Sequence, residues 1–430
     1  MSNRTTVLRL PHAIDSLGER NFRLFWLGQA VSLMGTWMQS TAQGWLVLHL
    51  TNSAFLLGLV TSIQFLPLFL FSLPAGEIAD RLPKKKVLYA TQCSMMLLAA
   101  ILGILILTGT VRYWHILLLA GLLGTANAFD NPTRQSFVPG LVEKKNIMNA
   151  IVLNSAAVQG ARMVGPALAG LAIGRWGMAS SFFLNAASFI TVLFGLLLIR
   201  VPAKAAEKQG KIRPWPRIAE GLHYIRHSPP MLSTIMLMGL VSTFAINFTV
   251  LVPVLAKANL GQGAEGYGFL MSAMGIGALA GAIIMAMLSH LGPRRLFLYG
   301  GGTGLCLFQI LLAATDNYRL AFLALGLTGW MSVTFITSAN TRLQVETTDN
   351  LRGRVMSVYS LVFLGVNLPG SLLSGFLAHI WGAPAALAAG AAAGLVSIAA
   401  VFAWEQRAAA RAGRSAAPDS DAGVHRPPPA

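Results

Sequence analysis

The sequence predicts an all-α membrane protein with about twelve transmembrane helices, arranged as two six-helix repeats. Only 11% of the 430 residues are charged and 55% are hydrophobic, whereas a soluble protein carries about 25% charged residues. About twelve apolar runs each approach the roughly 20 residues that cross a bilayer core of about 30 Å. The two sets of six runs also repeat weakly, at an offset of about 205–210 residues, which pairs Lys85-Lys86-Val87 with Arg294-Arg295-Leu296.

Hydropathy locates the predicted spans and divides the chain. The first six are expected at 22–48, 54–75, 87–107, 114–134, 148–173 and 181–199, and the last six at 231–256, 268–288, 296–314, 320–341, 355–379 and 383–404. We therefore expect a six-helix bundle over residues 1–200 and a second over 231–404. A linker over 201–230 should carry an amphipathic helix at 217–227 on the cytoplasmic membrane surface. Residues 405–430, rich in Ala, Arg and Pro, are expected to be a disordered cytoplasmic tail.

The formal net charge of +17 is distributed as in a membrane protein rather than a nucleic-acid-binding one. When loops are assigned alternately from a cytoplasmic N-terminus, 27 of the 32 Lys and Arg residues fall on the cytoplasmic side and four on the other. Cationic loops resist translocation, so this bias predicts that both termini are cytoplasmic, in a bacterial inner membrane. No nucleic-acid partner is expected. The N-terminus lacks the pattern of a cleaved signal peptide.

Residues 76–86 read Gly-Glu-Ile-Ala-Asp-Arg-Leu-Pro-Lys-Lys-Lys and follow the second predicted span. This pattern resembles the signature loop of the major facilitator superfamily. The resemblance implies that Gly76 lets the helix end pack closely. It also implies that Asp80 lies near the positive end of a neighbouring helix and pairs with Arg81, latching the two halves together, with Lys84 and Lys85 completing the motif. Lys84 is expected to be a solvated loop charge.

Further segments resemble the subgroup that contains bacterial enterobactin exporters and macrolide-efflux proteins. They are residues 21–26, 35–39, 130–134 and 221–229. In the predicted fifth span, Gly165, Pro166 and Gly170 resemble a helix-packing motif of the family's antiporter branch. That branch's fourth-helix arginine is replaced by Ala120, four residues before Gly124.

Three charged residues of the predicted spans, Asp130, Arg134 and Arg162, are expected at membrane depth, where a charge costs at least about 2.5–3.5 kcal/mol and usually faces water or a partner. Asp130 and Arg134 are four residues apart on one helical face. They are candidates for proton coupling, or they form an ion pair that shapes the turn. Arg162 shares its face with Gln159. It either contacts substrate in a wet cavity or pairs with a residue such as Asp130.

The first span carries a polar stripe at helical spacing, namely Gln29, Ser32, Thr36, Gln39 and Gln43. Such a face is poorly suited to lipid, so it either lines a water-accessible substrate path or makes hydrogen bonds between helices.

Together these features favour a secondary active transporter that exports a small amphipathic molecule, such as a drug-like compound or a siderophore, by alternating access. Proton coupling is expected because the sequence has no nucleotide-binding loop. An uptake symporter of the same fold is the first alternative, and a membrane enzyme or lipid-remodelling protein is the second. We expect a monomer without cofactor. His223 and His227 are four residues apart but have no evident third ligand, so no metal site is predicted.

Overall fold

The computed structural model describes residues 15–200 and 214–415, and the regular secondary structure of these ranges is entirely helical. The N-terminal half comprises α1 (Arg20–Thr51), α2 (Ala54–Arg81), α3 (Lys84–Leu107), α4 (Tyr113–Phe137), α5 (Ile147–Trp176) and α6 (Ala179–Leu198). The C-terminal half comprises α7 (Pro214–Arg226), α8 (Pro229–Ala245), α9 (Phe248–Ala258), α10 (Ala264–Met287), α11 (Arg295–Ala313), α12 (Tyr318–Glu346), α13 (Asp349–Gly365) and α14 (Asn367–Ser415).

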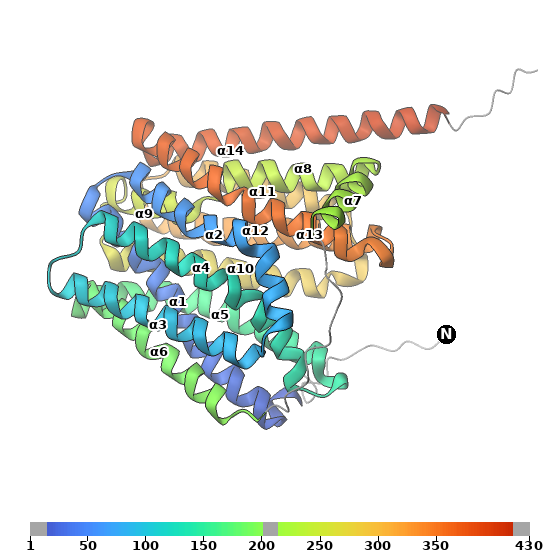
Figure 1. Cartoon of the computed structure of the whole chain (residues 1–430). Helices are drawn as coiled ribbons and strands as arrows, with labels where there is room; N and C mark the ends of the chain where they lie inside the picture. The colour runs from blue at the N-terminus through green and yellow to red at the C-terminus, as the bar shows by residue number, and fades with distance from the viewer. Residues whose placement is uncertain (1–14, 201–213, 416–430) are drawn as a thin grey trace, which may run out of the picture.

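These helices make the membrane passages that the sequence predicts. Nine helical stretches of the described residues are long and apolar enough to span a membrane, and α1 and α4 run through the same bundle (Figure 1). Helix α14 leaves helical geometry at Gly382, where φ is 82°, and turns back to make two passages. The prediction of an all-α membrane protein with two six-helix halves is confirmed.

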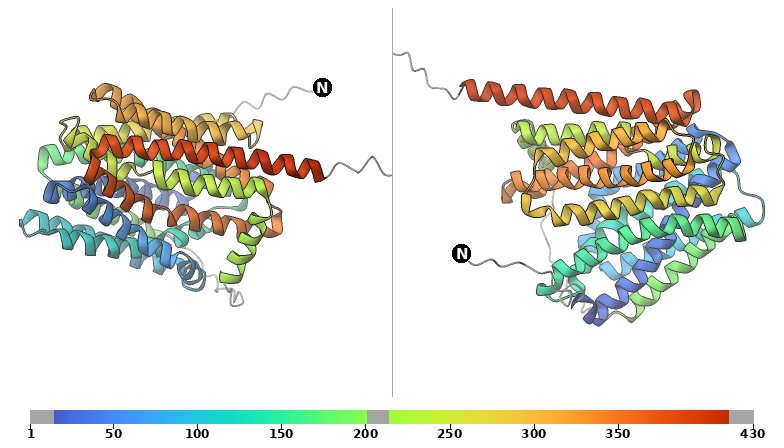
Figure 2. Two further views of the ribbon diagram at one scale, coloured as in Figure 1. Left: turned by 90° about the horizontal axis from the view of Figure 1, so that it is seen from above. Right: turned by 180° about the vertical axis from the view of Figure 1, so that it is seen from behind.

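The halves meet along two pairs of helices, α5 with α10 and α2 with α14. Small residues allow the close approach: a Cβ atom added at Gly268 of α10 would lie 2.4 Å from the carbonyl oxygen of Pro166, and one at Gly58 of α2 would lie 2.5 Å from that of Ser371. The start of α1 and the helix α7 lie at one end of the bundle, which we call the α7 side. Figures 1 and 2 show the halves diverging toward the α7 side and converging toward the opposite side.

Two predicted spans are broken helices. The span expected at 231–256 is interrupted at Ile246 and Asn247, between α8 and α9, and the span expected at 355–379 is interrupted at Val366, between α13 and α14. At the first break the Asn247 side-chain amide donates to the Thr243 carbonyl, 2.7 Å away, and Gly370 of α14 packs against both residues. A side-chain donor thus satisfies a carbonyl near the interrupted helical ladder.

Three expectations from the sequence need correction. Helix α14 continues to Ser415, so the chain is helical well beyond the expected end of the last span at residue 404, and residues 416–430 lie outside the described ranges. The segment 76–86, expected as a short loop, is mostly helical, because α2 extends through Arg81 and α3 begins at Lys84. The amphipathic helix α7 buries Ile218 and Ile225 in the C-terminal half instead of resting these residues on lipid.

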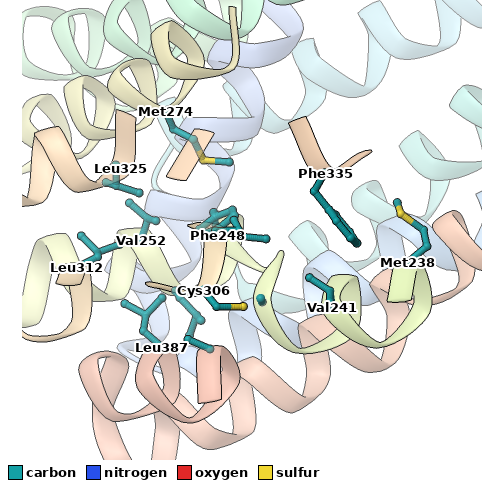
Figure 3. Close-up of a cluster of buried hydrophobic side chains, with 14 of the residues drawn as sticks. Met238, Val241, Phe248, Val252, Met274, Cys306, Leu312, Leu325, Phe335 and Leu387 are labelled. Carbon is teal, nitrogen blue, oxygen red and sulfur yellow. The ribbon is translucent and has the colours of Figure 1, made fainter. Parts of the chain in front are cut away.

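The hydrophobic cores of the two halves differ in continuity. In the C-terminal half, one large cluster of buried hydrophobic side chains includes residues from every helix between α8 and α14. Figure 3 shows Phe248, Cys306, Phe335 and Leu387 within this cluster. The buried side chains of the N-terminal half are divided among several smaller clusters. The C-terminal half is therefore the more continuously packed unit.

Candidate functional site

Asp130 forms a buried polar cluster with residues of α3 and α4. Its side chain is completely buried, and its Oδ2 atom lies 2.6 Å from Nη2 of Arg134, one turn later on α4. Its Oδ1 atom accepts hydrogen bonds from Thr91 Oγ1 at 2.8 Å and from Gln92 Nε2 at 2.9 Å, both on α3. The predicted pairing of Asp130 with Arg134 is thus present, while a role in proton coupling stays a prediction. The polar contacts from α3 could not be read from the spacing in α4.

Arg162 lies partly buried near the middle of α5, at the boundary between the halves. Gly275 of α10 packs against its carbonyl group, and its guanidinium lies over the Trp37 ring of α1, 5.5 Å from the ring centroid. A cation over an aromatic face is stabilised by the ring quadrupole. Among the ion pairs of the described residues, Asp130 pairs with Arg134 and not with Arg162. Gln159 lies partly buried one turn before Arg162 on the same helix.

The polar stripe of α1 is mostly buried rather than water-exposed. Gln29 and Ser32 are each 2% exposed, whereas Thr36 is an exposed residue of the stripe. Gln39 Oε1 accepts from Asn185 of α6 at 2.6 Å, and Gln43 donates to Gln64 of α2 at 3.1 Å.

In this conformation Gln39 and Gln43 make interhelical hydrogen bonds, the alternative that the sequence left open. The carbonyl oxygen of the buried Gln29 side chain has no hydrogen-bond partner within the described part of the chain. Substrate contact by the stripe remains a prediction.

Gly165, Pro166 and Gly170 lie where α5 contacts two other helices. A Cβ atom at Gly165 would lie 2.6 Å from Trp37 Cβ of α1, and one at Gly170 would lie 2.9 Å from the Ala264 carbonyl oxygen of α10. Next to Pro166, the Ala167 backbone N–H donates to Ser272 Oγ of α10 at 3.0 Å. These residues therefore lie at contacts both within and between the halves.

The segment predicted to form the latch is anchored within the N-terminal half. Lys84 is not a solvated loop charge, because its Nζ donates to the Ser136 carbonyl at the end of α4, 2.9 Å away. Lys85 Nζ donates to the Ile199 carbonyl at the end of α6, also at 2.9 Å. Both ammonium groups thus lie at helix C-termini, where the helix dipole favours a cation. Gly76 has open space around its Cα, and the side chains of Asp80 and Arg81 lie outside the described residues, so the latch role stays a prediction.

A closing contact between the halves lies on the opposite side and was not predicted. Lys257, at the end of α9, donates through Nζ to the Leu48 carbonyl at 3.0 Å and to Asn52 Oδ1 at 3.1 Å. It therefore caps the C-terminus of α1. Beside it, the buried rings of Trp45 and Tyr267 stack with centroids 5.8 Å apart. The sequence signal was that Lys257 is one of the few cations assigned to that side.

A second buried charge cluster, also unexpected, lies in the C-terminal half. Glu405 of α14 is 2% exposed and pairs with Arg342 of α12 at 2.8 Å and with Arg295 of α11 at 3.1 Å. Tyr299 of α11 donates its hydroxyl to the same carboxylate, and Arg342 also pairs with Glu346 at 3.0 Å. Within the described residues, no group of three His, Cys, Asp or Glu side chains is arranged to hold a metal ion.

Comparison with known proteins identifies a family model and several relatives, all of which are described as secretion or transport proteins. Residues 12–426 match the family model described as transmembrane secretion effector. The chain is 26% identical over 365 residues to the staphyloferrin A transporter of Staphylococcus aureus (strain NCTC 8325 / PS 47), with 84% of this chain and 90% of that protein covered. It is 27% identical over 384 residues to an enterobactin exporter of Shigella boydii serotype 4, with 88% and 89% covered.

Solved structures share the fold at lower identity. A bacterial homologue of the human lysosomal transporter Spinster, in an inward-facing and unoccupied conformation, matches with a TM-score of 0.67 and 15% identity over 93% of this chain and 96% of that one. A POT family transporter in complex with 5-aminolevulinic acid matches with a TM-score of 0.72 and 11% identity over 90% and 96%. The relatives are membrane transporters and not enzymes. The chain belongs to the transmembrane secretion effector family of the major facilitator superfamily.

Proposed function

We propose that this protein is a secondary active exporter that moves a small amphipathic molecule across the membrane by alternating access, with the α7 side in the cytoplasm. The observation that carries the proposal is the one-ended closure of the bundle. The halves are held together on the opposite side by the Lys257 cap on α1 and by the stacked Trp45 and Tyr267 rings. With the positive-inside orientation, this closure faces outward, so substrate would enter from the cytoplasm.

Alternating access requires the closing contacts to break in the other state. A contact that exists in one state shifts the equilibrium by the difference in its free energy between the states. The Lys257 cap joins a C-terminal helix to an N-terminal one, so rotation of one half against the other would remove it. At the glycine contacts between α5 and α10, by contrast, both helix surfaces are smooth, so one half could pivot against the other there.

Arg162 is the group that we propose for substrate recognition. It lies at the boundary between the halves, on Trp37, and a partly buried cation with an aromatic neighbour suits an anionic or aromatic amphipathic molecule. Thr36 and Gln159 are proposed as further polar contacts. The relatives named for staphyloferrin A and enterobactin support siderophores as the first compounds to test.

Asp130 is the group that we propose for coupling to a proton gradient. It is a fully buried carboxylate whose partner Arg134 is 16% exposed and also donates to Asn131 Oδ1. Protonation of Asp130 would release Arg134, and recovery of the ion pair would release the proton. The cycle would thus link protonation of Asp130 to the ion pair on α4.

Export from cells and from proteoliposomes tests the proposal. Cells with the protein should accumulate less of a transported dye, macrolide or siderophore than cells without it, and proteoliposomes should move it only with an imposed pH gradient. Arg162→Ala should weaken substrate binding, whereas Arg175→Ala, at the exposed end of the same helix, should not. Gradient-driven uptake into intact cells would support the symporter instead.

The orientation is tested separately by thiol labelling, in a variant whose Cys93 and Cys306 are replaced. A cysteine introduced at the exposed Thr110 should react with an impermeant external reagent, and one at the exposed Lys145 should be shielded. External labelling at position 145 would reverse the proposed orientation.

A further inference from the structure

A groove on the outer surface of the N-terminal half, between α3 and α4, lies away from the boundary between the halves. It has a volume of about 660 Å³, and its lining includes Lys86, Ala90, Ser94 and Leu97 of α3 and Phe129 of α4. Leu97 is 59% exposed, which places an open apolar wall on a membrane-spanning helix. The groove therefore opens to lipid.

The polarity of the groove changes along its length. Its wall is mostly apolar near Leu97. At the other end, which we call the groove mouth, lies the exposed Lys86 in the first turn of α3. Lys84 and Lys85 donate to carbonyl groups of α4 and α6, whereas Lys86 is exposed and lines the groove. The N-terminal turn of α3 adds the positive end of a helix dipole at the same place.

The length of the groove matches one leaflet of a bilayer. Leu97 lies eleven helical steps after Lys86, which at about 1.5 Å per residue is about 17 Å. Half of a hydrocarbon core of about 30 Å is about 15 Å. An acyl chain that begins at the Lys86 level would therefore fill the groove and end near the midplane.

We propose that this groove is a binding site for one anionic phospholipid of the leaflet on the α7 side, with an acyl chain between α3 and α4 and the headgroup phosphate at Lys86. Naming this the cytoplasmic leaflet rests on the orientation in the proposed function. The charge favours an anionic lipid over a zwitterionic one, because a juxtamembrane lysine attracts net negative headgroups. Thr91 belongs both to the groove wall and to the hydrogen-bond partners of Asp130. A bound chain therefore excludes water from this side of the buried carboxylate.

Lipid binding to the purified full-length protein in detergent tests the site without a transport assay, so its outcome is independent of the proposed function. Phosphatidylglycerol and phosphatidylcholine are titrated and the first bound lipid is followed by native mass spectrometry. We expect the wild-type protein to retain phosphatidylglycerol more tightly than phosphatidylcholine. Lys86→Gln should weaken the first phosphatidylglycerol about fivefold, which corresponds to about 1 kcal/mol for one lysine near a lipid surface.

Two matched controls separate this site from general lipid contact. Ser94→Trp should fill the groove and abolish the first binding event, whereas Ile101→Trp, exposed two turns further along α3 and outside the groove, should not. Arg294→Gln removes an exposed cation at the equivalent start of α11 and should leave binding unchanged. Unaltered binding in Ser94→Trp, with an unchanged melting temperature, would overturn the proposal. So would equal weakening by Lys86→Gln and Arg294→Gln, which would indicate a diffuse positive surface.

Discussion

The two halves place an arginine at the same point of their repeats but neutralise it differently. The offset that relates the halves pairs Arg134 of α4 with Arg342 of α12, and Asp130 with Ser338, each four residues before its arginine. In the N-terminal half the carboxylate comes from the same helix, one turn away. In the C-terminal half that position is a buried serine, and Arg342 pairs instead with Glu346, one turn later on α12, and with the buried Glu405 of α14.

The difference has a mechanical consequence. Glu405 connects α14 to α11 and α12, through Arg295, Tyr299 and Arg342, so this cluster ties three helices of the C-terminal half into one unit. The pair of Asp130 and Arg134 lies within α4 and can separate without moving a helix. The hydrophobic cores differ in the same way: the core of the C-terminal half is one continuous cluster, and the core of the N-terminal half is divided into smaller clusters. The C-terminal cluster therefore suits a structural role, and the N-terminal pair suits a switch.

The largest effect on stability is expected from Glu405→Gln. Breaking a buried ion pair by removing one partner costs about 3–5 kcal/mol. Arg342, with a side chain only 4% exposed, would keep only the more exposed Glu346 as an ionic partner. Thermal unfolding in detergent should show a large fall in melting temperature. Glu346→Gln is the control, since that side chain is 32% exposed and its ion pair should contribute less than about 1 kcal/mol. Equal falls in both variants would contradict the structural role of Glu405.

The next effect is expected on transport from Asp130→Asn. The asparagine fills the same space and can still accept from Thr91, but it carries no titrating proton and no charge for Arg134. We expect proton-driven export to be lost while substrate binding stays measurable and the melting temperature changes less than in Glu405→Gln. Export by Asp130→Asn proteoliposomes at the wild-type rate under an imposed pH gradient would make Asp130 structural. The switch assignment for the N-terminal half would then fall.

The contrast between the two clusters also marks what the sequence could predict. Asp130 and Arg134 share one helix at i, i+4 spacing, so their pairing follows from helical geometry alone. Glu405 contacts residues that are 63 and 106 positions away, and it follows the last apolar run, so hydropathy assigned it to a disordered tail. Its burial depends on three helices assembling around it, which is tertiary information.

The same limit applies to the helices themselves. The number and class of spans follow from apolar length, but the breaks at Asn247 and Val366 lie inside continuous apolar runs. The polar stripe of α1 was visible as a helical period, yet a period does not reveal whether Gln39 faces water or Asn185 of α6. For Gln39 the deciding contact is a hydrogen-bond partner on another helix, which a single helical period does not specify.

A smaller effect, a partial rescue, would sharpen the comparison. Ser338 Oγ and Arg342 Nη1 are buried without hydrogen-bond partners within the described residues. Ser338→Asp should reproduce the arrangement of the N-terminal half, with a carboxylate one helical turn before the arginine. In the Glu405→Gln background we expect it to restore part of the lost melting temperature. A double variant less stable than Glu405→Gln alone would show that the two repeats do not share this geometry.

The smallest effect is expected where the two halves meet, at Lys257. Lys257→Gln removes a cation from the C-terminus of α1 but keeps a hydrogen-bond donor, and such a charge contributes about 0.3–1 kcal/mol at an exposed helix end. In the proposed alternating-access cycle this contact breaks when the opposite side opens, so we expect the open arrangement to become about two- to fivefold more populated. Spin labels at Thr110 and Asp316, exposed in turns of the two halves on that side, would report the change as a larger population of long distances. Arg319→Gln is the control, because it removes a nearby exposed cation of α12 without touching α1. An identical distance distribution in Lys257→Gln and the wild-type protein would leave the closure to Trp45, Tyr267 and the glycine contacts.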